Sequence, residues 1–503
     1  MTVAQVAQAI GATVEGDGDL SARVLDVVTD SRAVRPGSLF LAIPGARVDG
    51  HDYVATAAAA GAVAAVTQRG LPGVGPTLVV EDPVAALGRL ARHVVHGARG
   101  GALQVLGITG SQGKTSTKDL LAQILERADA TVAALGNLNN ELGVPLTAVR
   151  VSEATRYLVV EMGARGIGHI AYLCRLTPPD VGVVLNVGHA HVGEFGGQAA
   201  IAVAKGELVE ALGPAGRAVL NADDPLVWAM RERTQASVTA FSVRGRPDAA
   251  AAVWATDIHS DELSRCRFRL HVAGDGGDGQ VEDQAEVRLQ LVGEHHVANA
   301  VAAAAAALAV GVDLDRVAAA LSGARLRSGS RMEVHERADD VVVVNDAYNA
   351  NPDSMRAAVG TLAVIGRARR VRWPQSRTWA VLGDMLELGE GAVGDHEALG
   401  ALVAEQGIDR LVTVGDFAEA LARGALAAGM THDQVLTRAD KSGVADLVRG
   451  RLSVGDAILV KASRGLALDT VAEEIWTSPV PAEPSRSAAA RASDRAAEMG
   501  DPA

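Results

Sequence analysis

Residues 103–120 limit the possible folds of this chain more than any other part of the sequence. They read LQVLGITGSQGKTSTKDL, which is an apolar, β-prone run, then a loop with glycines, and then the start of a helix that continues as LLAQILE. A strand that leads through such a loop into a helix is the opening half of a strand–helix–strand unit. We therefore predict an α/β fold with a mainly parallel sheet around this stretch.

The glycine-bearing loop is suited to bind a polyphosphate. Glycines allow backbone N–H groups to converge on phosphate oxygens, and the start of a helix adds positive potential. In addition, Lys114 can reach the terminal phosphates of a nucleotide, and the Thr115 hydroxyl can ligate Mg²⁺. The predicted ATP site consists of consecutive residues, namely Gly110, Ser111, Gln112, Gly113, Lys114 and Thr115.

This loop departs in one respect from the common phosphate-loop spacing. A glycine five residues before Gly113 would fall at position 108, where this chain has Ile108, so the match is to the shorter TGxxGKT form. The chain contains 55 glycines, and a chance turn is the alternative interpretation. The strand before the loop and the helix after it favour the phosphate site.

The composition is typical of a multidomain α/β protein. The chain has 503 residues, of which 48% are hydrophobic and only 3% are aromatic. This length is too great for one hydrophobic core, so we expect two to four domains. Because aromatic residues are scarce, the cores must consist mainly of Val, Leu, Ile and Ala, which suits buried parallel strands between helices.

Charge, cysteine content and hydropathy argue against several partners and locations. The formal net charge of -13 argues against nucleic acid or an anionic membrane as a main partner. The two cysteines, Cys174 and Cys266, form neither a CxxC motif nor a disulfide framework. So low a cysteine content is typical of a protein in a reducing compartment. The N-terminus lacks a basic start with a long apolar stretch, and the alanine-rich run near 300–310 is too short and too weakly apolar to span a bilayer. We expect a cytoplasmic protein without membrane insertion.

Changes in composition divide the chain into four segments. Residues 1–98 alternate short apolar runs with Gly, Pro and Asp turns, and the glycine-rich HGARGGAL precedes the phosphate loop. Residues 99–328 and 329–478 each show their own alternation of strand and helix patterns. We expect a small N-terminal α/β domain, a central ATP-binding domain, and a third domain with its own parallel sheet. The tail at 479–503 is small, polar and Pro-bearing, so we expect it to be disordered.

Residues 245–290 differ in character from the rest of the central segment. The stretch AGDGGDGQVEDQAE is rich in glycine and acidic residues, with no apolar periodicity. It is more typical of a solvated hairpin or an insertion than of a core element.

Polar residues near the ends of predicted strands are candidates for a metal site. Glu161 ends RYLVVE, and His191 lies in NVGHAHVGEF. A carboxylate is a suitable Mg²⁺ ligand, and histidine is a less usual one for a hard cation. Taken singly, each can be an ordinary surface residue, but a phosphate loop requires a divalent ion opposite it. Lys205, in VAKGEL, is taken alone most simply as a solvated helix lysine.

Taken together, a series of motifs resembles the Mur ligases from roughly Thr29 to Gly465. These motifs are GITGSQGKTSTKDL, GNLNNELGVPLT, EMGARGIGHI, NVGHAHVGEFG, AKGELVE, NADD, GEHHVANA, RMEV, NDAYNANPDSM, LGDMLELG and VKASRG. Within that family, NDAYNANPDSM and LGDMLELG resemble the member that adds D-alanyl-D-alanine to UDP-N-acetylmuramoyl-tripeptide. The resemblance implies an N-terminal domain for the uridine nucleotide, a central ATPase and a Rossmann-like C-terminal domain. We expect a monomer.

The resemblance also implies catalytic and metal-binding roles. Lys114 and Thr115 would serve the ATP phosphates and Mg²⁺, while Glu161 and His191 would hold metal. Lys205 would carry a carbamate, because carbon dioxide that adds to a neutral amine converts a cation into an anion able to orient Mg²⁺ ligands. The implied catalytic residues are Lys114, Glu161, His191 and Lys205, and the implied metal site is Thr115, Glu161, His191 and Lys205.

Further residues are implied to bind ATP or the substrates. Near the nucleotide these are Asn299, Arg331 and Asp346, the last two from the hinge and the third domain. For the uridine nucleotide they are Thr29, Asp30, Ser31 and Arg32, and for the muramyl-peptide Asn139 and Asn140. Weaker substrate assignments are Asp384, Glu387, Lys461, Ser463 and Arg464, next to an Ala462 where the family often has glycine. An Asp or Asn after a strand also commonly caps a helix or closes a turn.

The implied activity is ATP-dependent peptide ligation through an acyl phosphate, which would give the pentapeptide precursor of peptidoglycan. Two alternatives stay open. One is another Mur-type or folylpolyglutamate-type amide ligase, which would share the phosphate loop. The other is a regulatory protein that binds ATP without catalysis.

Overall fold

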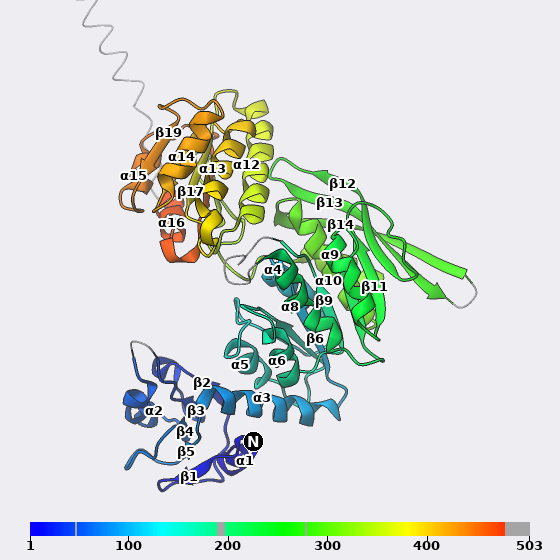
Figure 1. Cartoon of the computed structure of the whole chain (residues 1–503), viewed down its shortest axis with the longest axis vertical. Helices are drawn as coiled ribbons and strands as arrows, with labels where there is room; N and C mark the ends of the chain where they lie inside the picture. Colours follow the sequence, from blue (N-terminus) through cyan, green and yellow to red (C-terminus); the bar gives the residue numbers. More distant parts are fainter. Residues whose placement is uncertain (46–47, 189–196, 277–278, 478–503) are drawn as a thin grey trace, which may run out of the picture. The chain divides into compact units, whose positions relative to one another are not determined.

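Three separate, mostly parallel sheets with covering helices make up the chain (Figure 1), and the predicted α/β class is confirmed. The computed structural model describes residues 1–45, 48–188, 197–276 and 279–477. Contacts divide the chain into two compact units. The first consists of Met1–Met332, Asn351–Thr361 and Met385–Asp395, and the second consists of Glu333–Ala350, Leu362–Asp384 and the part from His396 onward.

The first sheet has five strands in the order β1-β5-β4-β3-β2, with only β1 antiparallel to its neighbour. The elements of this region are α1 (Val3–Ile10), β1 (Thr13–Glu15), β2 (Asp26–Val28), η1 (Ser31–Ala33), β3 (Ser38–Leu41), η2 (Gly50–Tyr53), α2 (Val54–Ala59), β4 (Ala64–Thr67), β5 (Thr77–Val79) and α3 (Pro83–Arg99). The long helix α3 begins at a local start signal, because Asp82 accepts hydrogen bonds from the first-turn N–H groups and Pro83 occupies the first helical position.

The central sheet has nine strands in the order β14-β13-β12-β11-β10-β9-β6-β8-β7. Its elements are β6 (Gln104–Thr109), α4 (Lys114–Glu126), β7 (Thr131–Ala133), α5 (Gly143–Ala148), β8 (Tyr157–Glu161), α6 (His169–Leu176), β9 (Val181–Val184), α8 (Gln198–Glu210), β10 (Arg217–Asn221), α9 (Pro225–Trp228), η3 (Ala229–Arg233), β11 (Ser237–Ser242), β12 (Ala252–Ser260), β13 (Arg265–Gly276), β14 (Gly279–Val292), α10 (His295–Ala309) and α11 (Leu314–Gly323). The strands from β7 to β12 pair in parallel, so their carboxyl ends share one edge of the sheet.

The hairpin predicted within residues 245–290 is confirmed. Strands β13 and β14 pair in antiparallel register from Arg265 opposite Val292 to Gly276 opposite Gly279, and β12 pairs antiparallel with β13. In Figure 1 these strands extend beyond the shorter parallel strands of the same sheet. The base of the hairpin is a core element, because Phe268 and Val287, which oppose each other, are both buried.

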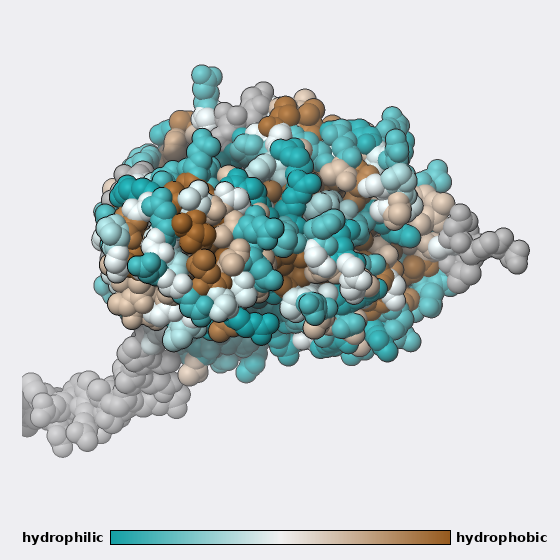
Figure 2. Space-filling model, turned by 90° about the horizontal axis from the view of Figure 1, so that it is seen from below, coloured by the Kyte–Doolittle hydropathy of each residue, from teal (hydrophilic) through white to brown (hydrophobic). Residues whose placement is uncertain are grey.

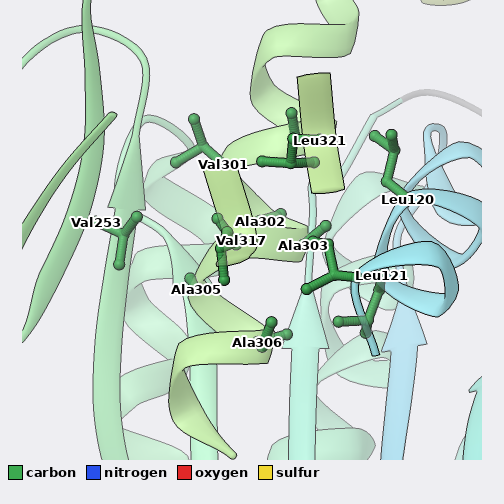
Figure 3. Close-up of a cluster of buried hydrophobic side chains, with 14 of the residues drawn as sticks. Leu120, Leu121, Val253, Val301, Ala302, Ala303, Ala305, Ala306, Val317 and Leu321 are labelled. Carbon is green, nitrogen blue, oxygen red and sulfur yellow. The ribbon is translucent and has the colours of Figure 1, made fainter. Parts of the chain in front are cut away.

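The alanine-rich helix α10 forms the centre of a hydrophobic core. Every residue from Ala302 to Ala307 is fully buried, and Figure 3 shows this helix with Val253 on one side and Leu120 and Leu121 of α4 on the other. Alanine methyl groups occupy little space, so the helix can approach the strands and helices around it closely. The alanine run is therefore a buried core helix.

The third sheet has six strands in the order β15-β16-β20-β17-β18-β19, with β15 antiparallel and the others parallel. Its elements are β15 (Glu333–Glu336), β16 (Val342–Asn345), α12 (Pro352–Arg372), β17 (Thr378–Gly383), η4 (Gly389–Gly391), α13 (Ala392–Glu405), β18 (Arg410–Val414), α14 (Ala418–Ala427), β19 (Val435–Arg438), α15 (Val444–Arg449), β20 (Ala457–Lys461), η5 (Arg464–Leu466) and α16 (Asp469–Thr477). The three sheets fall within the segments 1–98, 99–328 and 329–478, whose boundaries stay a prediction.

On the face that Figure 2 shows, hydrophobic residues form groups that are separated by hydrophilic residues. In the described ranges, no helix has both the length and the hydropathy needed for a transmembrane span. The predicted disordered tail, 479–503, lies outside the described residues.

Candidate functional site

The predicted phosphate loop joins the end of β6 to the start of α4. Gly113 caps α4 with a φ of +80°, a left-handed conformation that side chains rarely adopt. A Cβ atom at this position would also lie 2.4 Å from Oδ1 of Asn299. The left-handed φ favours glycine here whatever the space, and the short distance places Asn299, on α10, beside the loop. Its binding to the nucleotide stays a prediction.

Asn186, which follows β9, holds the phosphate loop in place. Its Oδ1 accepts hydrogen bonds from the backbone N–H groups of Ser111 and Gln112, each at 3.0 Å, and its Nδ2 donates to the Gln112 carbonyl at 3.2 Å. The Ser111 hydroxyl in turn accepts from the Gly188 N–H at 2.9 Å. The sequence analysis missed Asn186, although a polar residue directly after a buried strand was a usable signal.

Lys114 lies with its ammonium against the loop. Its Nζ donates to the Gly110 carbonyl at 2.7 Å and lies 3.4 Å from the Ser111 carbonyl oxygen. Burial lowers the pKa of Lys114, the negative charge of Glu161 opposes that shift, and the positive charge of Arg331 adds to it. These electrostatic interactions place Glu161 and Arg331 close to Lys114.

Glu161 lies at the centre of a polar cluster next to the phosphate loop. Strands β6 and β8 are parallel neighbours with Ile108 opposite Glu161, which places the carboxylate level with the start of the loop. The Thr115 hydroxyl donates to Oε2 at 2.7 Å, and Nδ2 of Asn139 donates to Oε1 at 2.7 Å. Glu161 is only 1% exposed, so these two bonds fix both carboxylate oxygens.

The donor set of this cluster fits Mg²⁺. The Thr115 hydroxyl and the Glu161 carboxylate supply hard oxygen ligands within hydrogen-bond distance of each other. Residues 1–45, 48–188, 197–276 and 279–477 contain no group of three or more His, Cys, Asp or Glu side chains that could hold a metal. A site with one carboxylate is the arrangement expected for Mg²⁺, which is usually bound by one or two carboxylates together with substrate phosphates. His191, the other predicted ligand, lies outside the described residues.

Lys205 is buried in the middle of α8, so its interpretation as a solvated lysine is wrong. Its exposed fraction is 6%. Burial, and secondarily the positive charge of Lys114, lower the pKa of Lys205 well below its usual value. Both effects favour the neutral amine, and the second places the two lysines near each other.

Behind the loop, α10 presents a second group of polar side chains. The Thr117 hydroxyl lies 3.4 Å from Oδ1 of Asn299, and Nδ2 of Asn299 lies 3.4 Å from Nδ1 of His296. Burial, with the nearby His295 and Arg331, lowers the pKa of His296 well below its usual value, so this imidazole is neutral. The structure thus brings Asn299 to the phosphate loop, and the charge of Arg331 acts on both Lys114 and His296.

The residues predicted to meet the uridine nucleotide follow β2. Asp30 caps the short helix η1 by accepting from the Arg32 N–H at 2.9 Å. Its carboxylate also pairs with the Arg32 guanidinium at 2.6 Å, and this hydrogen bond is the main cause that lowers the pKa of Asp30 to about 2. Thr29 is partly exposed, and Ser31 begins η1. Substrate binding at these residues stays a prediction.

Of the pair predicted to face the muramyl-peptide, only Asn139 joins the Glu161 cluster. The side chain of Asn140 instead closes the turn before α5, because its Oδ1 accepts from the Leu142 N–H at 3.3 Å and from the Gly143 N–H at 2.9 Å. Asn140 is nevertheless exposed. The alternative of a turn-closing residue therefore applies to Asn140 in this structure.

In the second unit, predicted residues lie at the carboxyl ends of β16 and β20. Lys461 is 2% exposed, and its Nζ donates to Oδ2 of Asp346 at 2.6 Å and to the Asn349 carbonyl at 2.8 Å. Nη1 of Arg464 donates to the Tyr348 hydroxyl at 3.2 Å. These bonds fix the loop that follows β16, and they give Lys461 a local structural role.

Asp384, Ser463 and Glu387 show local contacts of their own. The buried Asp384 carboxylate accepts from the N–H groups of Asp416 and Phe417, each at 2.9 Å, before α14. The Ser463 N–H donates to the Asp384 carbonyl at 3.0 Å. Glu387 is exposed and has a φ of +66°. Their predicted contacts with substrate stay predictions.

Comparison with protein families gives three matches along the chain. The Mur ligase family catalytic domain matches residues 26–94, and the Mur ligase middle domain matches residues 108–307. The Mur ligase glutamate ligase domain matches residues 330–464.

Two curated relatives of this chain carry the same name. The UDP-N-acetylmuramoyl-tripeptide--D-alanyl-D-alanine ligase of Mycobacterium tuberculosis is 43% identical over 514 residues, which cover 94% of this chain and 97% of that protein. The ligase of the same name from Escherichia coli is 34% identical, with 88% of this chain and 92% of that protein covered.

Solved structures show the same similarity at the level of the fold. MurF from Acinetobacter baumannii superposes with a TM-score of 0.79 at 31% identity. The superposition covers 95% of this chain and 99% of that chain. MurF from Thermotoga maritima in complex with ADP gives a TM-score of 0.72 at 28% identity, with 91% of this chain and 97% of that chain covered.

Proposed function

The chain belongs to the Mur ligase family, and from that membership we propose that it is an ATP-dependent ligase that joins D-alanyl-D-alanine to UDP-N-acetylmuramoyl-tripeptide. The product is the pentapeptide precursor of peptidoglycan. The observation that carries this proposal is the Glu161 carboxylate, tied through Thr115 to a phosphate loop, in a chain 43% identical to a ligase of that name.

The reaction must activate a carboxylate, because a carboxylate is a poor electrophile at neutral pH. An oxygen of the tripeptide carboxylate attacks the γ-phosphorus of ATP, the bond from this phosphorus to the β-phosphate oxygen breaks, and ADP leaves. The free amine of D-alanyl-D-alanine then attacks the acyl carbon, and phosphate leaves with the former carboxylate oxygen. The amine loses its proton, and the new amide bond remains.

Lys114 and the phosphate loop offset the repulsion between the two anions in the first step. The Lys114 ammonium lies 2.7 Å from the Gly110 carbonyl, at the mouth of the loop, where it can move to phosphate oxygens. The first-turn N–H groups of α4 have no acceptor within the helix and add positive potential. These fixed groups stabilise the charge that develops on the transferred phosphoryl group.

Thr115, Glu161 and His191 are the residues that would hold Mg²⁺. A bound Mg²⁺ would neutralise phosphate charge and orient the γ-phosphate for in-line attack. Asn139 keeps one oxygen of Glu161 in place through its bond of 2.7 Å, and Thr115 orients the other. The local cluster thus fixes the carboxylate before any ion binds.

Lys205 supports the proposal of a carbamate at this site. Only a neutral amine reacts with carbon dioxide, and burial beside Lys114 favours the neutral form of Lys205. The carbamate anion would then lie near the cationic Lys114 and would complete the oxygen ligands around the metal site.

The remaining predicted residues enter the proposal with the roles given above. The residues that would bind ATP are Asn299, Arg331 and Asp346. The residues that would bind the uridine nucleotide are Thr29, Asp30, Ser31 and Arg32. The residues that would bind the other substrate groups are Asn139, Asn140, Asp384, Glu387, Lys461, Ser463 and Arg464. We place the boundaries of the three domains at 98/99 and 328/329. The two free, buried cysteines, Cys174 and Cys266, suit a reducing compartment, and we propose a cytoplasmic monomer.

The test of this proposal is ligation by the purified chain. The chain is incubated with ATP, Mg²⁺ and UDP-N-acetylmuramoyl-tripeptide, and each of several amines is added separately. We expect the pentapeptide product and phosphate release with D-alanyl-D-alanine only. Ligation of a single amino acid to a shorter precursor, or of glutamate to a folate, would instead identify another amide ligase. Nucleotide binding without phosphate release would identify a regulatory protein.

A further inference from the structure

Lys118 is a buried lysine that the proposed reaction does not use. It lies on α4, about one helical turn after Lys114, and its side chain is 1% exposed. Its Nζ donates to the carbonyl oxygens of Ala134 at 2.7 Å and Gly136 at 2.9 Å, and it pairs with Oδ1 of Asp119 at 2.7 Å. These acceptors match the three N–H groups of an ammonium, so the group is fully satisfied inside the protein.

The two carbonyls belong to the loop of residues 134–142 between β7 and α5. Hydrophobic burial contributes little to holding the middle of this loop, because Leu135 is 68% exposed and Leu138 is 37% exposed. The conformation of the loop must therefore depend on its hydrogen bonds.

Three attachments hold this loop along its length. Lys118 binds its beginning, the Asn139 carbonyl accepts from the Gly163 N–H at 2.8 Å further along, and the Asn140 side chain closes the turn before α5 at its end. Only the first attachment is a side chain that comes from α4, the helix that begins at the phosphate loop. Lys118 therefore links the ATP-binding helix to the loop that presents Asn139 to Glu161.

We propose that Lys118 is a positioning residue, which holds the 134–142 loop so that Asn139 keeps the Glu161 carboxylate oriented beside Thr115. Lys118 touches none of the reacting groups and acts through Asn139. It couples the nucleotide site on α4 to the loop assigned to the muramyl-peptide. The kinetic consequences of this inference rest on the proposed function. The attachment of the loop by Lys118 is independent of that function.

The first test compares Lys118→Met with the unmodified chain. We expect kcat/KM for UDP-N-acetylmuramoyl-tripeptide to fall roughly 10- to 100-fold, because a small displacement of a catalytic carboxylate costs that much. The dissociation constant of ADP should change by less than about threefold, because the phosphate loop keeps its own contacts with Asn186. An unchanged kcat/KM in folded protein contradicts the proposal.

The matched control is Asp119→Asn. It removes the ion pair of 2.7 Å on the same helix, but it leaves both carbonyl bonds of Lys118 in place. Because asparagine keeps a side-chain oxygen that can accept from Nζ of Lys118, we expect kcat/KM to stay within about threefold of the unmodified value. A loss as large as that of Lys118→Met would assign the effect to the charge pair and overturn the loop attachment.

A double-mutant cycle separates action through Asn139 from general destabilisation. In an Asn139→Ala background, Lys118→Met should lower kcat/KM by less than about threefold further, because coupled residues are not additive. If the loss of kcat/KM in the double variant equals the product of the losses in the two single variants, the proposal is contradicted.

Hydrogen exchange provides a readout without nucleotide, metal or activity. Amides of residues 134–142 should exchange at least about tenfold faster in Lys118→Met, while those of β6 are unchanged. Equal exchange in the loop overturns the inference even if the chain has no ligase activity, and absence of ligation by the unmodified chain overturns only the proposed function.

If the Met variant does not fold, Lys118→Arg replaces it in every measurement. The planar guanidinium cannot direct donors tetrahedrally to these three acceptors, so values equal to the unmodified chain contradict the proposal.

Discussion

Neighbouring charges give the two buried lysines near the phosphate loop different chemistry. Burial lowers the pKa of Lys114, but the nearby Glu161 carboxylate opposes the shift and favours the ammonium. Within the described part of the chain, burial and the charge of Lys114 both lower the pKa of Lys205. One lysine is thus suited to bind phosphate as a cation, and the other is suited to react as a neutral amine.

Replacement of Lys114 by alanine should abolish most of the catalysis. We expect kcat to fall by at least about 100-fold, because one fixed charge at the transferred phosphoryl group is lost. Ligation is measured as pentapeptide formed. Lys441→Ala is the control, since this lysine also donates to a main-chain carbonyl, that of Ala467 at 3.2 Å, but lies outside the site. Ligation by Lys114→Ala at the unmodified rate would refute its catalytic role.

Lys205 should carry a carbamate in protein equilibrated with bicarbonate. Carbon-13 NMR of the folded chain in labelled bicarbonate should show one carbamate resonance that is absent from Lys205→Arg, because a guanidinium stays protonated. The Lys118→Arg variant, which changes another buried lysine, should keep the resonance. A spectrum of the unmodified chain with only free bicarbonate would rule out the modification.

At the scale of elements, the phosphate loop owes its shape to glycine and to a neighbouring strand. Gly113 has a φ of +80° and lies against Asn299, and Asn186 at the end of β9 binds the backbone of the loop. The loop is therefore formed before any nucleotide binds, which reduces the ordering that binding requires.

Gly113→Ala should weaken nucleotide binding. The left-handed conformation costs a residue with a side chain at least about 1 kcal/mol, so the dissociation constant of ADP should rise about fivefold or more in calorimetry. Gly97→Ala is the matched control. No atom lies within 4 Å of a Cβ built at Gly97, in helix α3, and alanine should there leave binding unchanged. Equal ADP affinity of Gly113→Ala and the unmodified chain would contradict this account of the loop.

The sequence could predict those elements whose cause is local. Gly113, Lys114 and Thr115 carry their signal in neighbouring residues, and Glu161 could be placed beside them because parallel strands end at one edge. The burial of Lys205 could not be predicted from neighbouring residues, because it depends on the elements against which α8 packs. The roles of Asn186 and Lys118 also depend on bonds between distant segments, so only the structure revealed them.

The third sheet illustrates a second limit of prediction. A strand-end Asp such as Asp384 can bind substrate or cap the next helix, and the sequence does not distinguish the two. In the structure its carboxylate accepts from Asp416 and Phe417. Lys461 similarly binds Asp346 and the loop after β16, so both residues have local partners.

At the scale of the whole molecule, the proposed ligands come from three segments of the chain, and ligation requires their substrates to meet at one γ-phosphate. We therefore predict that binding brings the segments together and excludes water from the acyl phosphate. We expect the radius of gyration from X-ray scattering to fall when a non-hydrolysable ATP analogue and UDP-N-acetylmuramoyl-tripeptide are both added. Either ligand alone should give a smaller change. Superimposable curves with and without both ligands would contradict closure.

Transfer of oxygen from the tripeptide to phosphate tests the central claim most directly. The terminal carboxylate of UDP-N-acetylmuramoyl-tripeptide is labelled with oxygen-18, the chain is supplied with ATP, Mg²⁺ and D-alanyl-D-alanine, and the released phosphate is analysed by mass spectrometry. An acyl phosphate formed at the loop predicts one labelled oxygen in each phosphate, together with the pentapeptide product. Unlabelled phosphate, or label that stays in the peptide alone, would contradict the account.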